Sequence, residues 1–267
     1  MATTIKWSTR LLSALVCALL CVPAAAWAQS GQRLADQDVK KVIEAVNETR
    51  DRFEDQLDGG LKNSILRGPK GEVRVRDYLD DFQKDVEALR DRFSPQYAAS
   101  NEAAAVLTRG TAMHAFMSAR PREIKGGSEW DRLSQELSRL AEVYRTTFPL
   151  PDGATVRRFN DAEAASTADA VARQADLLKK EIGREKSVDK SQRDSVRRDL
   201  DQLMKQAKTV KSRASGGKPA TAEVRQVLAL SATVGTFMQG KQLTPGTLAA
   251  WGAMRAPLDR LAQAYGM

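Results

Sequence analysis

Apolar residues recur at alternating intervals of three and four along most of the chain, which is the spacing of the buried face of an α-helix. These apolar stripes cover residues 39–57, 79–93, 99–117 and 130–144, and then residues 164–182, 200–214, 220–238 and 251–265. No comparable stretch alternates with the period of two that a half-buried strand shows. The pattern therefore predicts an all-α fold, and intervals near 3.5 residues favour up-down four-helix bundles.

The second set of stripes repeats the first. Residues 76–145 align without a gap to residues 197–266, an offset of 121, with 18 identities in 70 positions. The first helix of each set matches at an offset of 125. Matched aromatic and methionine positions are Trp130 with Trp251, Phe116 with Phe237, Met117 with Met238, and Tyr144 with Tyr265. We predict a tandem duplication of a four-helix unit with these residues in the repeated core. A ligand pocket lined by the tryptophans, phenylalanines and methionines of this set is the alternative.

Glycine and proline divide the chain between the predicted helices. Pro149, Pro151 and Gly153 mark a connection, so we expect a first repeat over residues 29–150, a linker over 151–160 and a second repeat over 161–267. Pro257 lies within the last apolar stripe, and we expect a kink or a restart of the helix there.

Residues 1–28 have the pattern of an export signal. Lys6 and Arg10 precede an apolar run over residues 11–22, and Ala26-Trp27-Ala28 provides a cleavage site after Ala28. The run is too short to span a bilayer, so we do not expect an integral membrane protein. Both cysteines lie in this segment, so the mature chain would have no disulfide and no thiolate chemistry. That composition favours a bacterial periplasm, with an extracellular location as the alternative.

Candidate catalytic and metal-binding residues are few. His114 is the only histidine. Met113 is adjacent to it and Met117 lies one helical turn further on, so neither can bind an iron from the side opposite His114. The acidic residues near Lys84 interleave with basic ones at helical spacing, which is typical of a solvated helix face. We therefore predict a non-enzymatic protein with no catalytic residue, no metal and no cofactor. A metal or haem carrier that uses His114 is the less favoured alternative.

Charge separates the two predicted repeats. The chain carries a formal net charge of +8, but residues 29–154 have a net charge of −2 and residues 155–267 a net charge of +8. The candidate binding residues on the basic side are Lys179, Lys180, Arg184, Lys186, Lys190, Arg193, Arg197, Arg198, Lys205, Lys208, Lys211 and Arg213. We call this set the basic patch. It predicts binding to an acidic envelope polymer, to anionic lipid head groups or to an acidic protein surface, with no nucleic acid expected in an exported protein.

Two further hypotheses concern the apolar residues. A periplasmic chaperone-like stress protein that uses exposed apolar grooves between helices is the alternative to an electrostatic binding protein. The second repeat also has the thinner core, since Ala207 stands where the first has Val86, and Ala214 where it has Phe93. Because each buried methylene contributes about 0.8 kcal/mol, we expect the second repeat to depend on packing against the first.

Overall fold

The computed structural model describes residues 33–68, 71–121 and 124–267, so the predicted export signal lies outside the described residues. Helix accounts for 73% of them, which confirms the mostly helical prediction. None of the helices in these ranges is long and apolar enough to cross a membrane. The longer helices are α1 (Asp36–Gln56), α3 (Val75–Arg92), α4 (Ser100–Ser118), α5 (Gly127–Val143), α6 (Asp161–Arg184), α7 (Lys190–Ser215), α8 (Thr221–Gln239) and α9 (Pro245–Tyr265).

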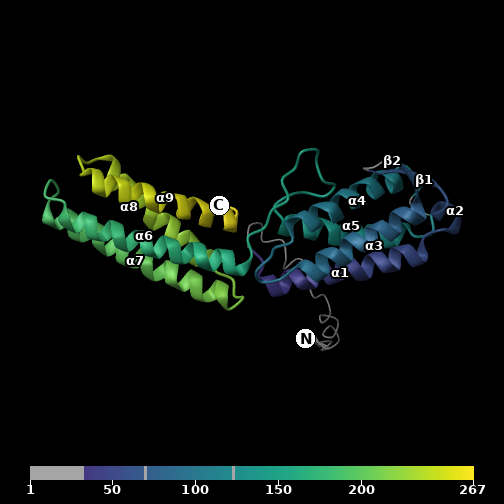
Figure 1. The fold of residues 1–267 in the computed structure, drawn as a ribbon, viewed down its shortest axis with the longest axis horizontal. Helices are drawn as coiled ribbons and strands as arrows, with labels where there is room; N and C mark the ends of the chain where they lie inside the picture. The colour runs from purple at the N-terminus through teal and green to yellow at the C-terminus, as the bar shows by residue number, and fades with distance from the viewer. Residues whose placement is uncertain (1–32, 69–70, 122–123) are drawn as a thin grey trace, which may run out of the picture. The chain divides into compact units, whose positions relative to one another are not determined.

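Helices α1, α3, α4 and α5 share one buried apolar cluster, which we call the N-terminal core (Figure 1). Helix α1 packs against α3 and α5, and α4 packs against the same two helices. Large side chains fill this core, and its fully buried members include Phe53, Tyr78, Phe82, Leu133 and Tyr144. The apolar stripe that predicted each helix is thus the face that it buries.

Helices α6, α7, α8 and α9 share a second buried cluster, which we call the C-terminal core. Helix α6 packs against α7 and α9, and α8 packs against the same two, so the order of neighbours is that of the N-terminal helices. Small residues are frequent here. Ala207 and Ala214 are both fully buried, where the N-terminal core has Val86 and Phe93. The described residues therefore bury two apolar cores and not one.

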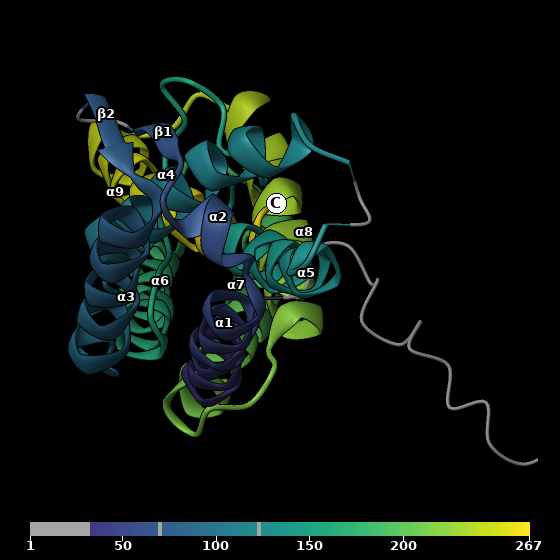
Figure 2. The same cartoon turned by 90° about the vertical axis from the view of Figure 1, so that its right-hand side faces the viewer.

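A short hairpin interrupts the N-terminal helices. The one-turn helix α2 (Gly59–Lys62) leads into β1 (Ile65–Gly68), which pairs antiparallel with β2 (Gly71–Arg74), beside α3 and α4 (Figure 2). The prediction of helices alone missed these strands, because four residues are too few to establish an alternating pattern. Leu66 is the buried residue of the hairpin and belongs to the N-terminal core.

Local capping explains where the C-terminal helices begin. The Asn160 side chain accepts from the Glu163 backbone N–H and Glu163 accepts from that of Asn160, a capping box at the start of α6. Thr244 caps α9 with Pro245 in its first turn. The restart expected at Pro257 does not occur, since α9 continues from Pro245 to Tyr265. Pro257 cannot donate to the carbonyl of Ala253, which is an exposed residue, so water can satisfy that oxygen.

Candidate functional site

The basic patch lies on α6, on α7 and on the turn between them. About half of its members form ion pairs with neighbouring carboxylates. These pairs are Lys179–Asp201, Lys180–Asp176, Arg184–Glu181, Arg197–Asp194, Lys211–Asp169 and Arg213–Glu223. Most of these side chains are solvent-exposed, so the pairs contribute little stability and remain open to competition by another anion.

Six members of the patch form no ion pair with the residues that the structure describes, and Arg193 is the one of these six that is partly buried. The other five carry the free positive charge of the patch. They are exposed, and they are Lys186, Lys190, Arg198, Lys205 and Lys208. Lys205 and Lys208 also line, with Arg213, a shallow hollow of about 520 Å³ on the outer face of α7. Met204 and Thr209 lie in the same hollow, so it offers apolar contact beside positive charge.

Nearby cations lower the pKa values of two carboxyl groups on α6. A hydrogen bond from Lys211, with the charges of Arg173 and Lys208, holds the pKa of Asp169 below its ordinary value. Two turns further along α6, Lys180 lowers the pKa of Asp176 in the same way, with smaller effects from two other lysines. Carboxylates here are stabilised in their charged form, as an incoming anion would be.

Two arginines of the patch have structural roles instead. Arg193 donates to the backbone carbonyls of Glu185 and Val188, which close the end of α6. Arg213 pairs with Glu223 across α7 and α8, and Arg92 forms the corresponding pair with Glu102, 121 residues earlier. Neither arginine is as free to bind a partner as Lys205.

The predicted core residues are buried to different extents in the two halves. Trp130, Phe116, Met117, Met238, Tyr144 and Tyr265 are buried. Trp251 and Phe237 are only partly buried and pack against the C-terminal core from its edge.

His114 packs among aromatic rings. Its ring lies 6.1 Å from Trp130 and 5.7 Å from Phe148 between centroids, and its Nδ1 has no hydrogen-bond partner among the described residues. No group of three or more His, Cys, Asp or Glu side chains in the described ranges is placed to hold a metal ion. The geometry around His114 is that of a packed side chain.

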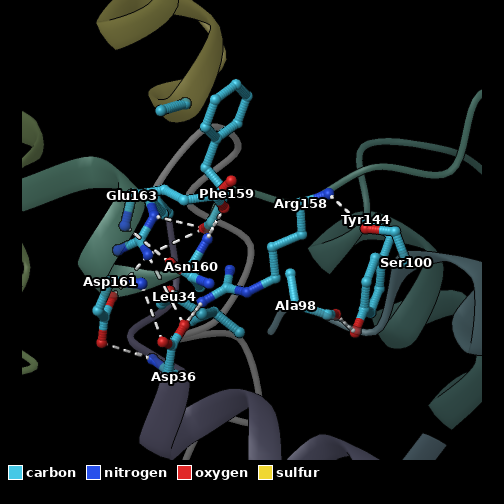
Figure 3. A network of polar contacts seen from close by, with 12 residues as sticks. Leu34, Asp36, Ala98, Ser100, Tyr144, Arg158, Phe159, Asn160, Asp161 and Glu163 are labelled. Atoms are coloured by element: carbon cyan, nitrogen blue, oxygen red, sulfur yellow. Dashed lines mark hydrogen bonds and ion pairs between the residues drawn. The ribbon is translucent and has the colours of Figure 1, made fainter. Parts of the chain in front are cut away.

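A buried polar network that the sequence analysis missed joins the first turn of α1 to the first turn of α6 (Figure 3). Arg33 forms an ion pair with Asp161 at 2.6 Å, and Arg158 forms one with Asp36 at 2.6 Å. The two aspartates also exchange backbone contacts. The Asp36 N–H donates to Asp161 Oδ2 at 3.0 Å, and the Asp161 N–H donates to Asp36 Oδ2 at 2.9 Å. We call these four residues the Arg–Asp network.

The Arg–Asp network is reciprocal in its backbone contacts as well. The guanidinium of Arg33 donates to the Phe159 carbonyl, and that of Arg158 donates to the Leu34 carbonyl at 2.8 Å. Each guanidinium also lies near a buried tyrosine. Arg33 is 5.7 Å from the Tyr265 ring, and the charge of Arg158 acts on Tyr144, whose pKa burial raises. Each aspartate thus occupies the N-terminus of the other's helix, where negative charge is favoured.

A signal for this network is present in the sequence. Arg33 and Arg158, Leu34 and Phe159, and Asp36 and Asp161 are each separated by 125 residues, the offset that aligns the first predicted helices. Extending that alignment six residues before the apolar stripe would have found the matched Arg and Asp positions. Which side chains meet could not have been found this way, because the contacts depend on tertiary structure.

Comparisons with protein-family models, with curated proteins and with solved structures found no match to this chain.

Proposed function

We propose that the protein is an exported, non-enzymatic binding protein of the cell envelope that contacts an acidic partner through α6 and α7. The observation that carries this proposal is the pair Lys205 and Lys208. Both are exposed, neither forms an ion pair within the described ranges, and both line the hollow on α7. Clustered cations of this kind attract anions and accelerate their capture.

The proposal includes a tandem duplication of a four-helix unit. Its support is the shared order of helix neighbours, the repeated Arg–Glu pair between the third and second long helices, and the reciprocal Arg–Asp network. Helices α4 and α8 also begin and end at positions 121 residues apart. Convergence on similar apolar stripes would not place the same ion pairs at the same offsets.

Binding to heparin and to vesicles that contain an anionic phospholipid tests the acidic partner. We expect binding at low salt that is lost at high salt, because exposed charges are screened. The double variant Lys205→Glu/Lys208→Glu should weaken it by about tenfold or more. Heparin binding without vesicle binding would identify an acidic polymer, and the reverse would identify a lipid surface.

The matched control is Lys40→Glu/Lys41→Glu on α1. It changes the net charge by the same amount at two exposed positions on the acidic half of the chain. Binding should survive in this control. The proposal fails if neither probe binds at low salt, or if the two double variants lose affinity equally.

A further inference from the structure

One side of α8 and α9 combines apolar side chains with an absence of charge. Leu228, Ala232 and Gly235 follow one another at helical spacing on α8, and Leu248 and Trp251 do so on α9. The two helices meet here, since a Cβ added at Gly235 would lie 3.2 Å from the Trp251 ring. We call these five residues the α8–α9 face. Between Gln226 and Met254, Lys241 is the only charged residue.

This face is open to solvent. Leu248 is 49% exposed, and Leu228 and Trp251 are only partly buried. Exposed apolar surface that is contiguous on a protein often marks a binding site. The matching side of the N-terminal helices α4 and α5 indicates which kind of partner would fit.

The matching side of α4 and α5 is covered by the chain itself. The segment that follows α5 returns across it, and Phe148, Leu150 and Val156 pack against the N-terminal core. The Leu150 N–H donates to the Thr111 hydroxyl at 2.7 Å. Gly110 gives the Phe148 ring its room, because an added Cβ would lie 3.0 Å from it.

On the side that this segment covers, the side chains of α4 and α5 are more completely buried than their matches on α8 and α9. Leu107 is 0% exposed and Trp130 is 4% exposed, whereas their matches, Leu228 and Trp251, remain partly exposed. The offset of 121 places Ala232 where Thr111 stands and Gly235 where His114 stands. The α8–α9 face is therefore the same kind of surface without its covering segment, and it has more room at Gly235.

We propose that the α8–α9 face binds an extended, largely apolar peptide segment with an aromatic residue, supplied by another protein. The aromatic ring lies at Gly235 and Trp251, as Phe148 lies at Gly110 and His114. Arg255 follows Leu248 and Trp251 at helical spacing and forms no ion pair with the described part of the chain. A carboxylate near the aromatic residue of the peptide would complement the charge of Arg255. Proline restricts the conformations of an extended segment, so a proline-containing peptide loses less entropy when it binds.

The proposal is separate from the acidic partner of α7. Lys205 and Lys208 line a hollow formed by α7 residues alone, and none of the five residues of the α8–α9 face lines it. Apolar contact is insensitive to screening, so the two kinds of binding differ in their salt dependence.

The probe is a fluorescent synthetic peptide with the sequence of residues 146–157, which contains Phe148, Leu150 and Asp152. Fluorescence anisotropy with the purified protein should give saturable binding that persists at high salt. Replacing the phenylalanine and the leucine of the peptide by serine should abolish it. The protein variant Ala232→Glu should weaken binding by about tenfold or more.

Two further protein variants test whether the effect is specific to the α8–α9 face. Thr233→Glu introduces the same charge at the next exposed position, which points away from α9, and should leave binding unchanged. Ala232→Thr restores the hydroxyl that Thr111 provides and should raise the affinity several-fold.

The proposal is overturned if the peptide does not bind, or if Ala232→Glu and Thr233→Glu have equal effects. It is also overturned if Lys205→Glu/Lys208→Glu abolishes peptide binding. A dimer in sedimentation experiments that Ala232→Glu dissociates would show instead that a second copy of this chain occupies the face.

Discussion

The four long N-terminal helices and the four C-terminal helices pack in the same order of neighbours, but the side chains in their two cores differ in size. Phe93 and Val86 fill positions of the first core where Ala214 and Ala207 fill those of the second. The β1–β2 hairpin and the segment that follows α5 add further cover to the N-terminal half. The C-terminal half has neither addition, and it has the charge excess and the open apolar face. Core packing and exposed surface thus differ between two similar helical arrangements.

The largest expected effect concerns the independence of the C-terminal half. Residues 155–267 expressed alone lose Arg33 and Asp36, so Arg158 and Asp161 keep no ionic partner from the network. With alanine in place of larger core residues, the fragment should unfold without a cooperative thermal transition. Residues 33–154, which contain the fuller core, should retain one. Circular dichroism during heating measures both, and a C-terminal fragment as cooperative and as stable as the full chain would contradict this prediction.

The next effect comes from breaking the Arg–Asp network on either side. Arg33→Met and Arg158→Met should each destabilise the protein by about 3–5 kcal/mol, because each takes the nearest counter-ion from a buried carboxylate. After Arg158→Met, Asp36 keeps only the longer contact with Arg33 at 3.7 Å. The side chains of Arg33 and Arg158 are 4% and 3% exposed, so the two costs should be similar. Urea unfolding gives the free energies.

A double-mutant cycle separates the interaction energy of the Arg158–Asp36 pair from the other effects of the substitutions. Adding Asp36→Ala to Arg158→Met should restore part of the lost stability, since it removes a buried charge that has lost its nearest partner. A cost below about 1 kcal/mol for either single variant would show that the network does not hold the two halves together.

These differences explain what the sequence could and could not predict. The stripes ending at Phe93 and Ala214 predicted the helices, because a helix buries one face at a fixed period. The restart expected at Pro257 does not occur, because the cost of a proline within a helix depends on whether water reaches the unpaired carbonyl. The basic patch was predicted from composition, but composition could not show that Arg213 pairs with Glu223 while Lys205 stays unpaired. Ion pairs depend on which helices become neighbours, and the sequence pattern does not contain that information.

A smaller effect concerns the cap at the start of α9 in the C-terminal half. The buried carboxylate of Glu185 accepts hydrogen bonds from the Thr244 N–H at 2.9 Å and from the Thr244 and Thr247 hydroxyls at 2.6 and 2.5 Å. Burial raises the pKa of Glu185, but these hydrogen bonds together outweigh it and hold the pKa below its ordinary value. Glu185→Gln should cost about 1–3 kcal/mol at neutral pH.

The pH dependence of that cost follows from the direction of the shift. A carboxyl whose pKa is lowered in the folded state stabilises it fully above the unfolded pKa, and this contribution is lost as the pH falls through the folded pKa. The difference in unfolding free energy between the wild type and Glu185→Gln should therefore shrink below about pH 4.3. Urea unfolding at a series of pH values measures it, and a difference that is constant down to pH 3 would contradict the assignment.

The smallest effect compares two matched tyrosines at the ends of α5 and α9. Tyr144 and Tyr265 are both buried, and the Tyr144 hydroxyl donates to the Ala98 carbonyl at 2.6 Å. The Tyr265 hydroxyl has no hydrogen-bond partner among the described residues. Tyr144→Phe should cost about 0.5–1.5 kcal/mol because it leaves that carbonyl unpaired, whereas Tyr265→Phe should be neutral or slightly stabilising. Urea unfolding of the two variants side by side tests this, and equal costs would show that Tyr265 has a partner of its own, which would make the two halves more alike than their cores suggest.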